Sequence, residues 1–350
     1  MSKFAMGTIY ERFVRPALFR LDPETAHHLA IRCLQLSSLT PSIWRLVQTT
    51  ADTKSSKDLF GLHFRNPVGL AAGFDKNAVA LPAWEGLGFG FAEVGTITSI
   101  RQEGNPKPRI FRIAESEALI NRLGFNNEGA ERVALRLEAL KKSGRWPKIP
   151  IGINLGKSKI IPLEAAAEDY CRAFRSFSHL GDYFVLNVSS PNTPGLRQLQ
   201  ERTAIQELFS VVRHETGGKP ILVKIAPDLD WHQTENVLEM AESHGLAGVI
   251  ATNTTIDHNA IPAQFRTEGG LSGSPLRTRA MEVLQFVKQR SKLPVISVGG
   301  IMSADEALRR LDAGADLLQV YTGFIYRGPG LIRAILKRIP AESNALEPPV

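Results

Sequence analysis

The chain has 350 residues, of which 43% are hydrophobic, and a net charge of +7, so it can fill the core of one large domain with an extension. It contains no run of 18 apolar residues, which argues against a transmembrane helix, and we expect no secretory signal because no basic region followed by an apolar stretch opens the sequence. The positive charge suits a nucleic acid, a membrane surface or an acidic ligand, but without a basic run or a nucleic-acid motif we expect no nucleic-acid partner.

Residues 1–50 are predicted to form helices with apolar faces. A first helix has apolar residues at i, i+3, i+4 and i+7 spacing: Tyr10, Phe13, Val14, Ala17, Leu18 and Leu21. Asp22-Pro23 predicts the start of a second helix through Leu34, and Thr40-Pro41 the start of a third through Val47. Six basic and three acidic residues accompany these faces. The pattern suits helices lying on anionic lipid, and equally a helical cap on the rest of the fold or a dimer contact.

Eight apolar runs follow, and each ends in polar or glycine residues. The runs cover residues 67–76, 91–96, 149–154, 183–186, 221–227, 248–254, 294–300 and 317–323. Segments of helical composition lie between them, at 128–142, 163–180, 198–214, 231–243, 278–290 and 304–313. Eightfold strand–helix alternation predicts a (β/α)8 barrel, and runs that are apolar throughout suit parallel strands buried on both faces.

The predicted fold class is therefore α/β, a (β/α)8 TIM barrel with an N-terminal helical extension. Residues 1–50 form the extension, residues 51–60 a polar linker, residues 61–340 the barrel and residues 341–350 a tail. The cysteines Cys33 and Cys171 lie in helical segments without metal-ligand spacing. We expect both to be buried, reduced thiols, and we expect no metal site.

Active sites of such barrels lie at the carboxyl ends of the strands. Those ends here carry Lys76, Thr96, Asn154, Asn187, Lys224, Thr252 with Asn253, Gly299 with Gly300, and Tyr321. The most polar of these ends opens the loop Asn187–Arg197, in which two prolines fix φ and hold the amides and hydroxyls in place. This pattern predicts one pocket for a small, flat, polar molecule.

Ten motifs in these segments resemble the quinone-dependent (class 2, membrane-associated) dihydroorotate dehydrogenases. They span about residues 60–330 in the family's order and comprise Ala71–Lys76, Glu93–Thr98, Gly104–Arg112, Asn121–Asn126, Gly152–Lys157, Asn187–Arg197, Val223–Asp228, Ala251–Thr255, Gly269–Gly273 and Tyr321–Phe324. The resemblance implies oxidation of dihydroorotate to orotate in pyrimidine biosynthesis. A proton leaves one ring carbon and a hydride its neighbour, and a flavin, here non-covalent FMN, passes the electrons to a membrane quinone.

The resemblance also assigns residues. Ser190 takes the place of the catalytic base, with Thr193 as a candidate for its proton relay. The substrate-binding residues are Lys76, Asn121, Arg122, Leu123, Gly124, Phe125, Asn187, Asn192, Asn253 and Thr254. The FMN-binding residues are Ala72, Gly73, Phe74, Asp75, Lys76, Thr96, Asn154, Asn187, Lys224, Thr252, Gly273, Gly300, Tyr321 and Thr322. The quinone path passes His27, Arg112 and Tyr321. Without the resemblance, His27 would be a helix-surface histidine, and Lys224 could form a structural ion pair.

The resemblance implies that residues 1–50 meet the membrane and admit the quinone. We therefore expect a peripheral protein on the cytoplasmic face of a bacterial inner membrane, bound to anionic lipid and without an obligate protein partner. Three alternatives remain on sequence grounds. The first is a Schiff-base aldolase that uses Lys76 or Lys224, the second another flavin barrel that reduces pyrimidines or tRNA uridine, and the third a non-catalytic binding module.

Overall fold

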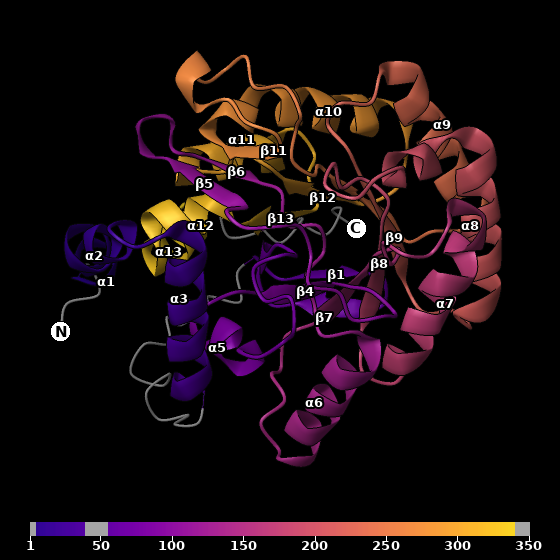
Figure 1. Ribbon diagram of the computed structural model, residues 1–350, viewed down its shortest axis with the longest axis horizontal. Coiled ribbons are helices and arrows are strands. Elements are labelled where there is room, and N and C mark those ends of the chain that lie inside the picture. Colours follow the sequence, from indigo (N-terminus) through magenta and orange to yellow (C-terminus); the bar gives the residue numbers. More distant parts are fainter. Residues whose placement is uncertain (1–4, 39–54, 340–350) are drawn as a thin grey trace, which may run out of the picture.

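The computed structural model describes residues 5–38 and 55–339 and contains the predicted barrel. Eight parallel strands close it in the order β10-β12-β13-β3-β4-β7-β8-β9 (Figure 1). Their bounds are β3 Val68–Leu70, β4 Phe91–Ile97, β7 Ile151–Leu155, β8 Tyr183–Asn187, β9 Ile221–Ile225, β10 Gly248–Ala251, β12 Val295–Val298 and β13 Leu317–Val320. Every residue of these strands is buried, which explains why the strands were visible as uninterrupted apolar runs.

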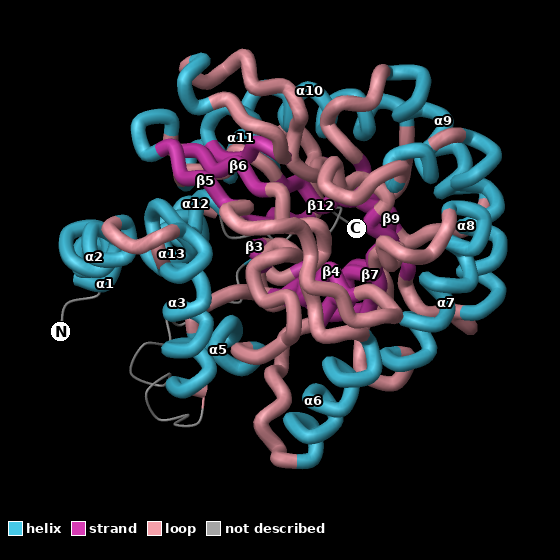
Figure 2. The backbone as a smooth tube through the Cα atoms, in the orientation of Figure 1, coloured by secondary structure: helices cyan, strands magenta, loops and turns pink. Residues whose placement is uncertain are grey.

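A helix follows each strand and covers the outside of the barrel (Figure 1). These helices are α5 Leu81–Gly86, α6 Ala130–Lys142, α7 Ala166–Phe177, α8 Arg202–Glu215, α9 Trp231–Ser243, α10 Arg277–Arg290, α11 Ala304–Asp312 and α13 Pro329–Arg338, with the short α12 Thr322–Arg327 before the last. The six predicted helical segments all coincide with helices of this outer layer. The loops that follow the strands cross over one end of the barrel (Figure 2).

Two small sheets were not predicted. The antiparallel hairpin β1 Lys57–Leu59 and β2 Leu62–Phe64 begins inside the predicted linker, and Phe64 packs edge-on against Phe91 in the barrel interior. The other sheet joins β5 Ile110–Ile113, β6 Ala118–Asn121 and β11 Gly270–Gly273. Residues 51–54 of the linker and the tail 341–350 lie outside the described residues.

The N-terminal extension comprises α1 Ala5–Ile9, a π-helical turn Tyr10–Val14, α2 Arg15–Phe19 and α3 Pro23–Ser37. Asp22 caps α3 as predicted, because its carboxylate accepts hydrogen bonds from the amides of Glu24 (3.1 Å) and Thr25 (3.0 Å). The predicted third helix, from Pro41 to Val47, lies outside the described residues. No helix among the described residues is long and apolar enough to cross a membrane.

The apolar face predicted for residues 10–21 is divided between two environments. Tyr10 donates a hydrogen bond to the carbonyl of Ile325 (2.6 Å), whereas Phe13 (69% exposed), Val14 and Leu21 face solvent. A π-helical turn holds more residues per turn than an α-helix, so the α-helical spacing does not keep these positions on one side. The expectation for Cys33 was wrong, since it is exposed beside Leu29 and Leu36, whereas Cys171 is buried as expected.

Candidate active site

A single large cavity opens at the carboxyl ends of the barrel strands. It holds about 1090 Å³ of free space, counting its open mouth. Its lining comes from seven of the eight strand ends, all except that of β7, and from the sheet β5-β6-β11. The predicted site residues in this lining are Ala72, Gly73, Lys76, Thr96, Asn121, Leu123, Gly124, Phe125, Asn187, Ser190, Asn192, Lys224, Thr252, Asn253, Thr254, Gly273, Gly300, Tyr321 and Thr322.

Four predicted substrate-binding asparagines form two hydrogen-bonded pairs in this cavity. Asn253 donates to the side-chain oxygen of Asn187 (3.3 Å), and Asn192 donates to that of Asn121 (3.1 Å). They come from three segments, which are the end of β8 with its loop (Asn187 and Asn192), the end of β6 (Asn121) and the loop after β10 (Asn253), and the fold brings these segments together at the mouth of the barrel. Amide groups carry both donors and acceptors, which allows them to bind a ring with alternating N–H and C=O groups.

Ser190 lies in the loop after β8 and is buried, with its hydroxyl accepting a hydrogen bond from the amide of Asn192 (3.3 Å). The hydroxyl oxygen is therefore fixed at the cavity wall. The hydroxyl of Thr193 is buried as well and has no hydrogen-bond partner among the described residues. Thr193 is not part of the cavity lining.

A buried polar network lies beneath the cavity, inside the barrel. Asn154 does not line the cavity, but its oxygen accepts from Thr96 (2.6 Å) and Asn187 (3.1 Å), and its nitrogen donates to Glu93 (2.7 Å). Gln319 donates to the other oxygen of the Glu93 carboxyl group (2.6 Å). Glu93 lies in one of the predicted motifs, but no role was predicted for it. A carboxylate in the middle of a buried strand must find polar partners, and this position could have identified Glu93 as part of the network.

The two lysines of the cavity are held in unusual electrostatic environments. Burial lowers the pKa of Lys76 to about 8, and the positive charge of Arg109 acts in the same direction. Burial also lowers the pKa of Lys224, while the charge of Glu93 opposes that shift. The pKa of Glu93 is raised by its own burial, and the charge of Lys224 opposes this. Lys224 thus lines the cavity and is influenced by the charge of the buried Glu93, and its contact with a cofactor stays a prediction.

Gly299 and Gly300 form a close-approach site after β12. Both have positive φ, +113° and +73°, and a Cβ atom on Gly300 would collide with the backbone of Arg277. The buried Arg310 supports this turn by donating to the carbonyls of Gly299 (2.9 Å) and Arg277 (2.8 Å). Nearby, Ser272 and Thr322 share a hydrogen bond (2.8 Å). A turn of this kind exposes backbone N–H groups, which suits a phosphate.

Besides Asn154, three predicted cofactor or substrate residues lie outside the cavity lining. Asp75 is buried and accepts hydrogen bonds from the backbone of Val79 (2.8 Å) and Ala80 (2.9 Å) and from the Trp84 indole (3.1 Å). Phe74 packs edge-on against Tyr321 and His27. Arg122 donates to the carbonyl of Pro108 (3.0 Å). These residues shape the loops around the cavity, and direct contact with a ligand stays a prediction.

The predicted quinone-path residues extend from the main cavity, which Tyr321 lines, through Arg112 of β5 to His27 of α3. The rings of His27, Phe74 and Tyr321 follow one another at centroid distances of 5.2 Å, and Arg112 stacks on Phe19 of α2 at 4.1 Å. His27 is half-buried against Phe74. Burial, with the charge of Lys76 next, lowers its pKa to about 3. A second cavity lies here, lined by His27, Ile31, Phe74 and Lys76 among others.

The comparisons with known proteins agree with this geometry. A family model described as dihydroorotate dehydrogenase matches residues 55–342. The chain belongs to the dihydroorotate dehydrogenase family. It is 51% identical to a dihydroorotate dehydrogenase (quinone) of Gloeobacter violaceus over 332 residues, covering 93% of this chain and 92% of that protein. A second relative of the same name, from Salinispora arenicola, is 50% identical over 335 residues, covering 93% of this chain and 97% of that protein.

A solved structure is similar as well. The crystal structure of the enzyme from Eimeria tenella in complex with ferulenol is 36% identical and covers 90% of each chain, with a TM-score of 0.81. The predicted family and the predicted (β/α)8 barrel are thereby confirmed, and so is the expectation of an oxidoreductase. An aldolase, a pyrimidine or tRNA reductase and a non-catalytic binding module are no longer viable alternatives.

Proposed function

We propose that this enzyme oxidises dihydroorotate to orotate in pyrimidine biosynthesis, with FMN as the hydride acceptor and a membrane quinone as the final electron acceptor. Family membership supports the reaction and the acceptor. The assignment of dihydroorotate as the substrate depends on one observation. The paired asparagines lie in the same cavity as Ser190 and Lys76. The asparagines match the ring amides of the substrate, and the Lys76 ammonium suits its carboxylate.

The chain's residues also fit FMN. The positive φ values of Gly299 and Gly300, and the close packing of Gly300 against the Arg277 backbone, form a turn of the kind that can direct backbone N–H groups at a phosphate. Lys224 would supply a positive charge to the ring system, and Thr96 and Asn187 would supply polar contacts. FMN, when bound, would accept a hydride and release electrons singly or in pairs to a quinone. The lowered pKa of Lys224 reflects burial, and a nearby anion would favour its charged form.

Ser190 would remove the proton from the substrate ring. A serine hydroxyl is a weak base, so its position and the onward route of the proton matter more than its pKa. The hydrogen bond from the Asn192 amide fixes the hydroxyl oxygen. The buried, unpaired hydroxyl of Thr193 is a candidate for the next step, with a water between the two.

The N-terminal helices would bring the protein to the lipid surface. Phe13 and Val14 are exposed on the π-helical turn, Leu21 in the turn before α3, and Leu29 and Leu36 on α3. Exposed apolar residues with arginine neighbours suit an anionic membrane surface. We therefore propose peripheral binding to the cytoplasmic face of a bacterial inner membrane, with the quinone approaching past His27, Arg112 and Tyr321.

Two measurements test the proposed function. The purified protein should be yellow, release FMN on denaturation, and lose its visible absorbance when dihydroorotate is added without oxygen. The variant Ser190→Ala should keep its flavin and bind orotate, yet bleach about 10²–10⁴-fold more slowly, which is the usual contribution of a positioned base. A colourless protein that takes up no FMN would overturn the cofactor, and a Ser190→Ala variant that bleaches at the normal rate would overturn the base.

A further inference from the structure

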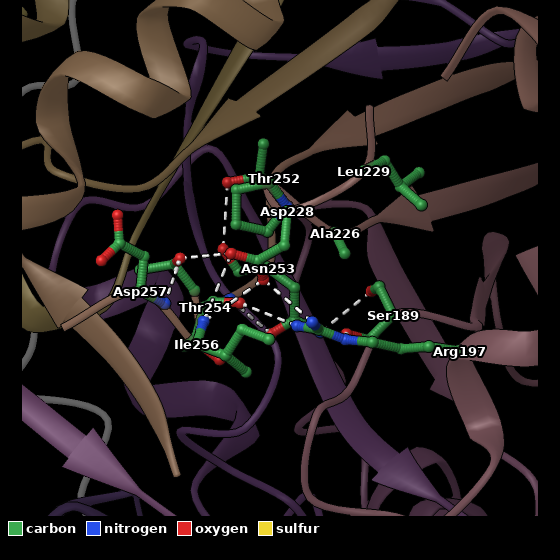
Figure 3. Close-up of polar contacts among 12 residues, drawn as sticks. Ser189, Arg197, Ala226, Asp228, Leu229, Thr252, Asn253, Thr254, Ile256 and Asp257 are labelled. Carbon is green, nitrogen blue, oxygen red and sulfur yellow. Dashed lines mark hydrogen bonds and ion pairs between the residues drawn. The ribbon is translucent and has the colours of Figure 1, made fainter. Parts of the chain in front are cut away.

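The guanidinium group of Arg197 joins three loops at the mouth of the barrel (Figure 3). Its Nε donates to the carbonyl of Ser189 in the loop after β8 (3.1 Å), and one terminal nitrogen donates to the carbonyl of Thr254 after β10 (3.3 Å). The other terminal nitrogen pairs with the carboxylate of Asp228 after β9 (2.9 Å). Each nitrogen of this rigid fork has its own acceptor, which is a use of arginine that lysine cannot reproduce.

Local sequence explains how Arg197 reaches back to the start of its own loop. Pro191 and Pro194 stiffen the segment, and Gly195 has a φ of +70°, a conformation that turns the chain and that glycine adopts without strain. The turn leads into the single helical turn Leu196–Gln200 and directs the Arg197 side chain towards Ser189, eight residues earlier.

The contact with Ser189 bears directly on Ser190, because the Ser189 carbonyl and the Ser190 amide belong to one planar peptide unit. Fixing that carbonyl fixes the orientation from which the Ser190 side chain leaves the backbone. A second contact supports the same unit, since Asn253 donates to the hydroxyl of Ser189 (2.9 Å). The segment that carries Ser190 is thus tied to the loop that carries two predicted substrate-binding residues.

Asp228 gives this arrangement a firm anchor. One carboxylate oxygen receives the Arg197 ion pair, and the other accepts hydrogen bonds from the hydroxyl of Thr255 and the amide of Ile256 (3.3 Å). The Arg197 and Asp228 side chains are 24% and 16% exposed, so water screens their attraction less than it would at the open surface. The guanidinium is therefore held both by the base loop and by the loop after β9.

We propose that Arg197 is the positioning residue for the Ser190 base, acting through the Ser189 carbonyl and anchored by Asp228. The inference rests on the proposed role of Ser190. A weak base is effective only when it is held close to the carbon it deprotonates, and a displacement of about 1 Å can cost about 10²-fold in rate. Arg197 does not line the cavity, so its removal should move the base without removing a substrate contact.

The test compares Arg197→Gln with Arg202→Gln in the FMN-loaded enzyme. Arg202 is a matched control, because it lies five residues further on, forms an exposed ion pair with Glu239 (2.8 Å) and contacts no loop of the mouth. We expect Arg197→Gln to slow bleaching by saturating dihydroorotate about 10–100-fold, with FMN content and melting temperature close to those of the control. Deuterium on the carbon that loses the proton should slow Arg197→Gln more than the unmodified enzyme, because proton removal becomes more rate-limiting.

A measurement independent of turnover is amide hydrogen exchange of residues 187–197. Exchange in this segment should accelerate in Arg197→Gln and stay unchanged in Arg202→Gln. Arg197→Lys should recover little of the rate, because a single ammonium group cannot occupy all three acceptor positions. If Arg197→Gln does not fold, Asp228→Asn tests the same arrangement from its anchor, with a smaller loss in rate expected.

The outcomes separate this inference from the proposed function. If Ser190→Ala bleaches slowly but Arg197→Gln and Asp228→Asn bleach at the control rate, the base assignment stands and the positioning role is refuted. The positioning role is also refuted if Arg197→Gln is slow without faster exchange in residues 187–197. If Ser190→Ala itself bleaches at the normal rate, the proposed base is wrong, and Arg197 has no base to position.

Discussion

A buried ion pair between Glu24 of α3 and Arg109 of the barrel provides a sharp test of how the N-terminal helices are held. The guanidinium of Arg109 donates to one oxygen of Glu24 at 2.7 Å and from its Nε to both oxygens at 3.2 Å. The two side chains are only 7–8% exposed. Replacing Glu24 by alanine would leave the Arg109 charge buried without its acidic partner.

The size of the effect follows from this burial. Removing one partner of a buried pair costs about 3–5 kcal/mol. Arg109 keeps the carbonyls of Glu103 (2.6 Å) and Asn105 (3.0 Å) as acceptors, so we expect the lower end of that range. Since α3 lies at the edge of the molecule (Figure 1), the loss should appear as local opening of α3, with its open population raised roughly 100-fold, at about 1.4 kcal/mol per factor of ten.

Amide hydrogen exchange over residues 23–37 measures this opening in Glu24→Ala. The control is Glu239→Ala, which removes the partner of Arg202 at an exposed site (54% exposed), where a pair contributes about 0–1 kcal/mol. Unchanged exchange in α3 of Glu24→Ala, or an equal change in the control, would refute the view that this pair holds the helix.

The same pair predicts a pH dependence with a definite sign. Burial alone would raise the pKa of Glu24, but the hydrogen bonds and charge of Arg109 outweigh it, so the pKa lies below its usual value. A glutamate whose pKa is lower in the folded protein stabilises the fold at any pH above its pKa in the unfolded chain, which is near 4.3. This stability is lost as the pH falls through the pKa of the folded protein. Opening of α3 should therefore increase below about pH 4 in the unmodified protein, and Glu24→Ala should lack this step.

Three further outcomes are expected. The pKa of His27 is lowered to about 3 by burial, so its ring proton NMR shifts should stay flat between about pH 5 and 8, where an ordinary histidine titrates. Gly300→Ala should fold but retain less FMN after gel filtration, because its Cβ would displace the backbone of Arg277. Phe13→Glu should weaken binding to anionic vesicles. The control Leu135→Glu, at an exposed position on α6, should not weaken it. Equal binding of both variants would contradict the proposed membrane face.

The sequence was sufficient for the barrel because the barrel strands leave a strong local pattern. A strand such as Tyr183–Asn187 is buried on both faces, so its apolar run is unbroken and bounded by polar residues. The site followed from the same pattern, since the strand ends of a closed barrel converge. Asn187, Lys224 and Asn253 are far apart in the chain but line one cavity.

The sheet β5-β6-β11 leaves no comparable pattern. Its strands have four residues each, and Leu119 pairs with Ser272 across a sequence separation of about 150 residues. Periodicity also failed for Cys33, for a different reason. The spacing of Leu29, Cys33 and Leu36 does form an apolar stripe on α3, but the stripe faces solvent. An apolar pattern predicts that a face exists and leaves open what covers it.

The arginines explain the remaining gap between the predicted and the observed site. Arginine is usually exposed, so a sequence gives no reason to assign Arg109, Arg197 or Arg310 a place inside the fold. Arg197 and Arg310 each donate to carbonyl groups of two different segments, and Arg109 joins its own loop to Glu24 of α3. Strand register determines which residues reach the cavity, but it does not fix loops beyond the strand ends. Those loops carry the proposed base and the proposed phosphate site. The barrel's backbone hydrogen bonds do not extend to them, but an arginine guanidinium, which is planar and has several donors, can hold them in place.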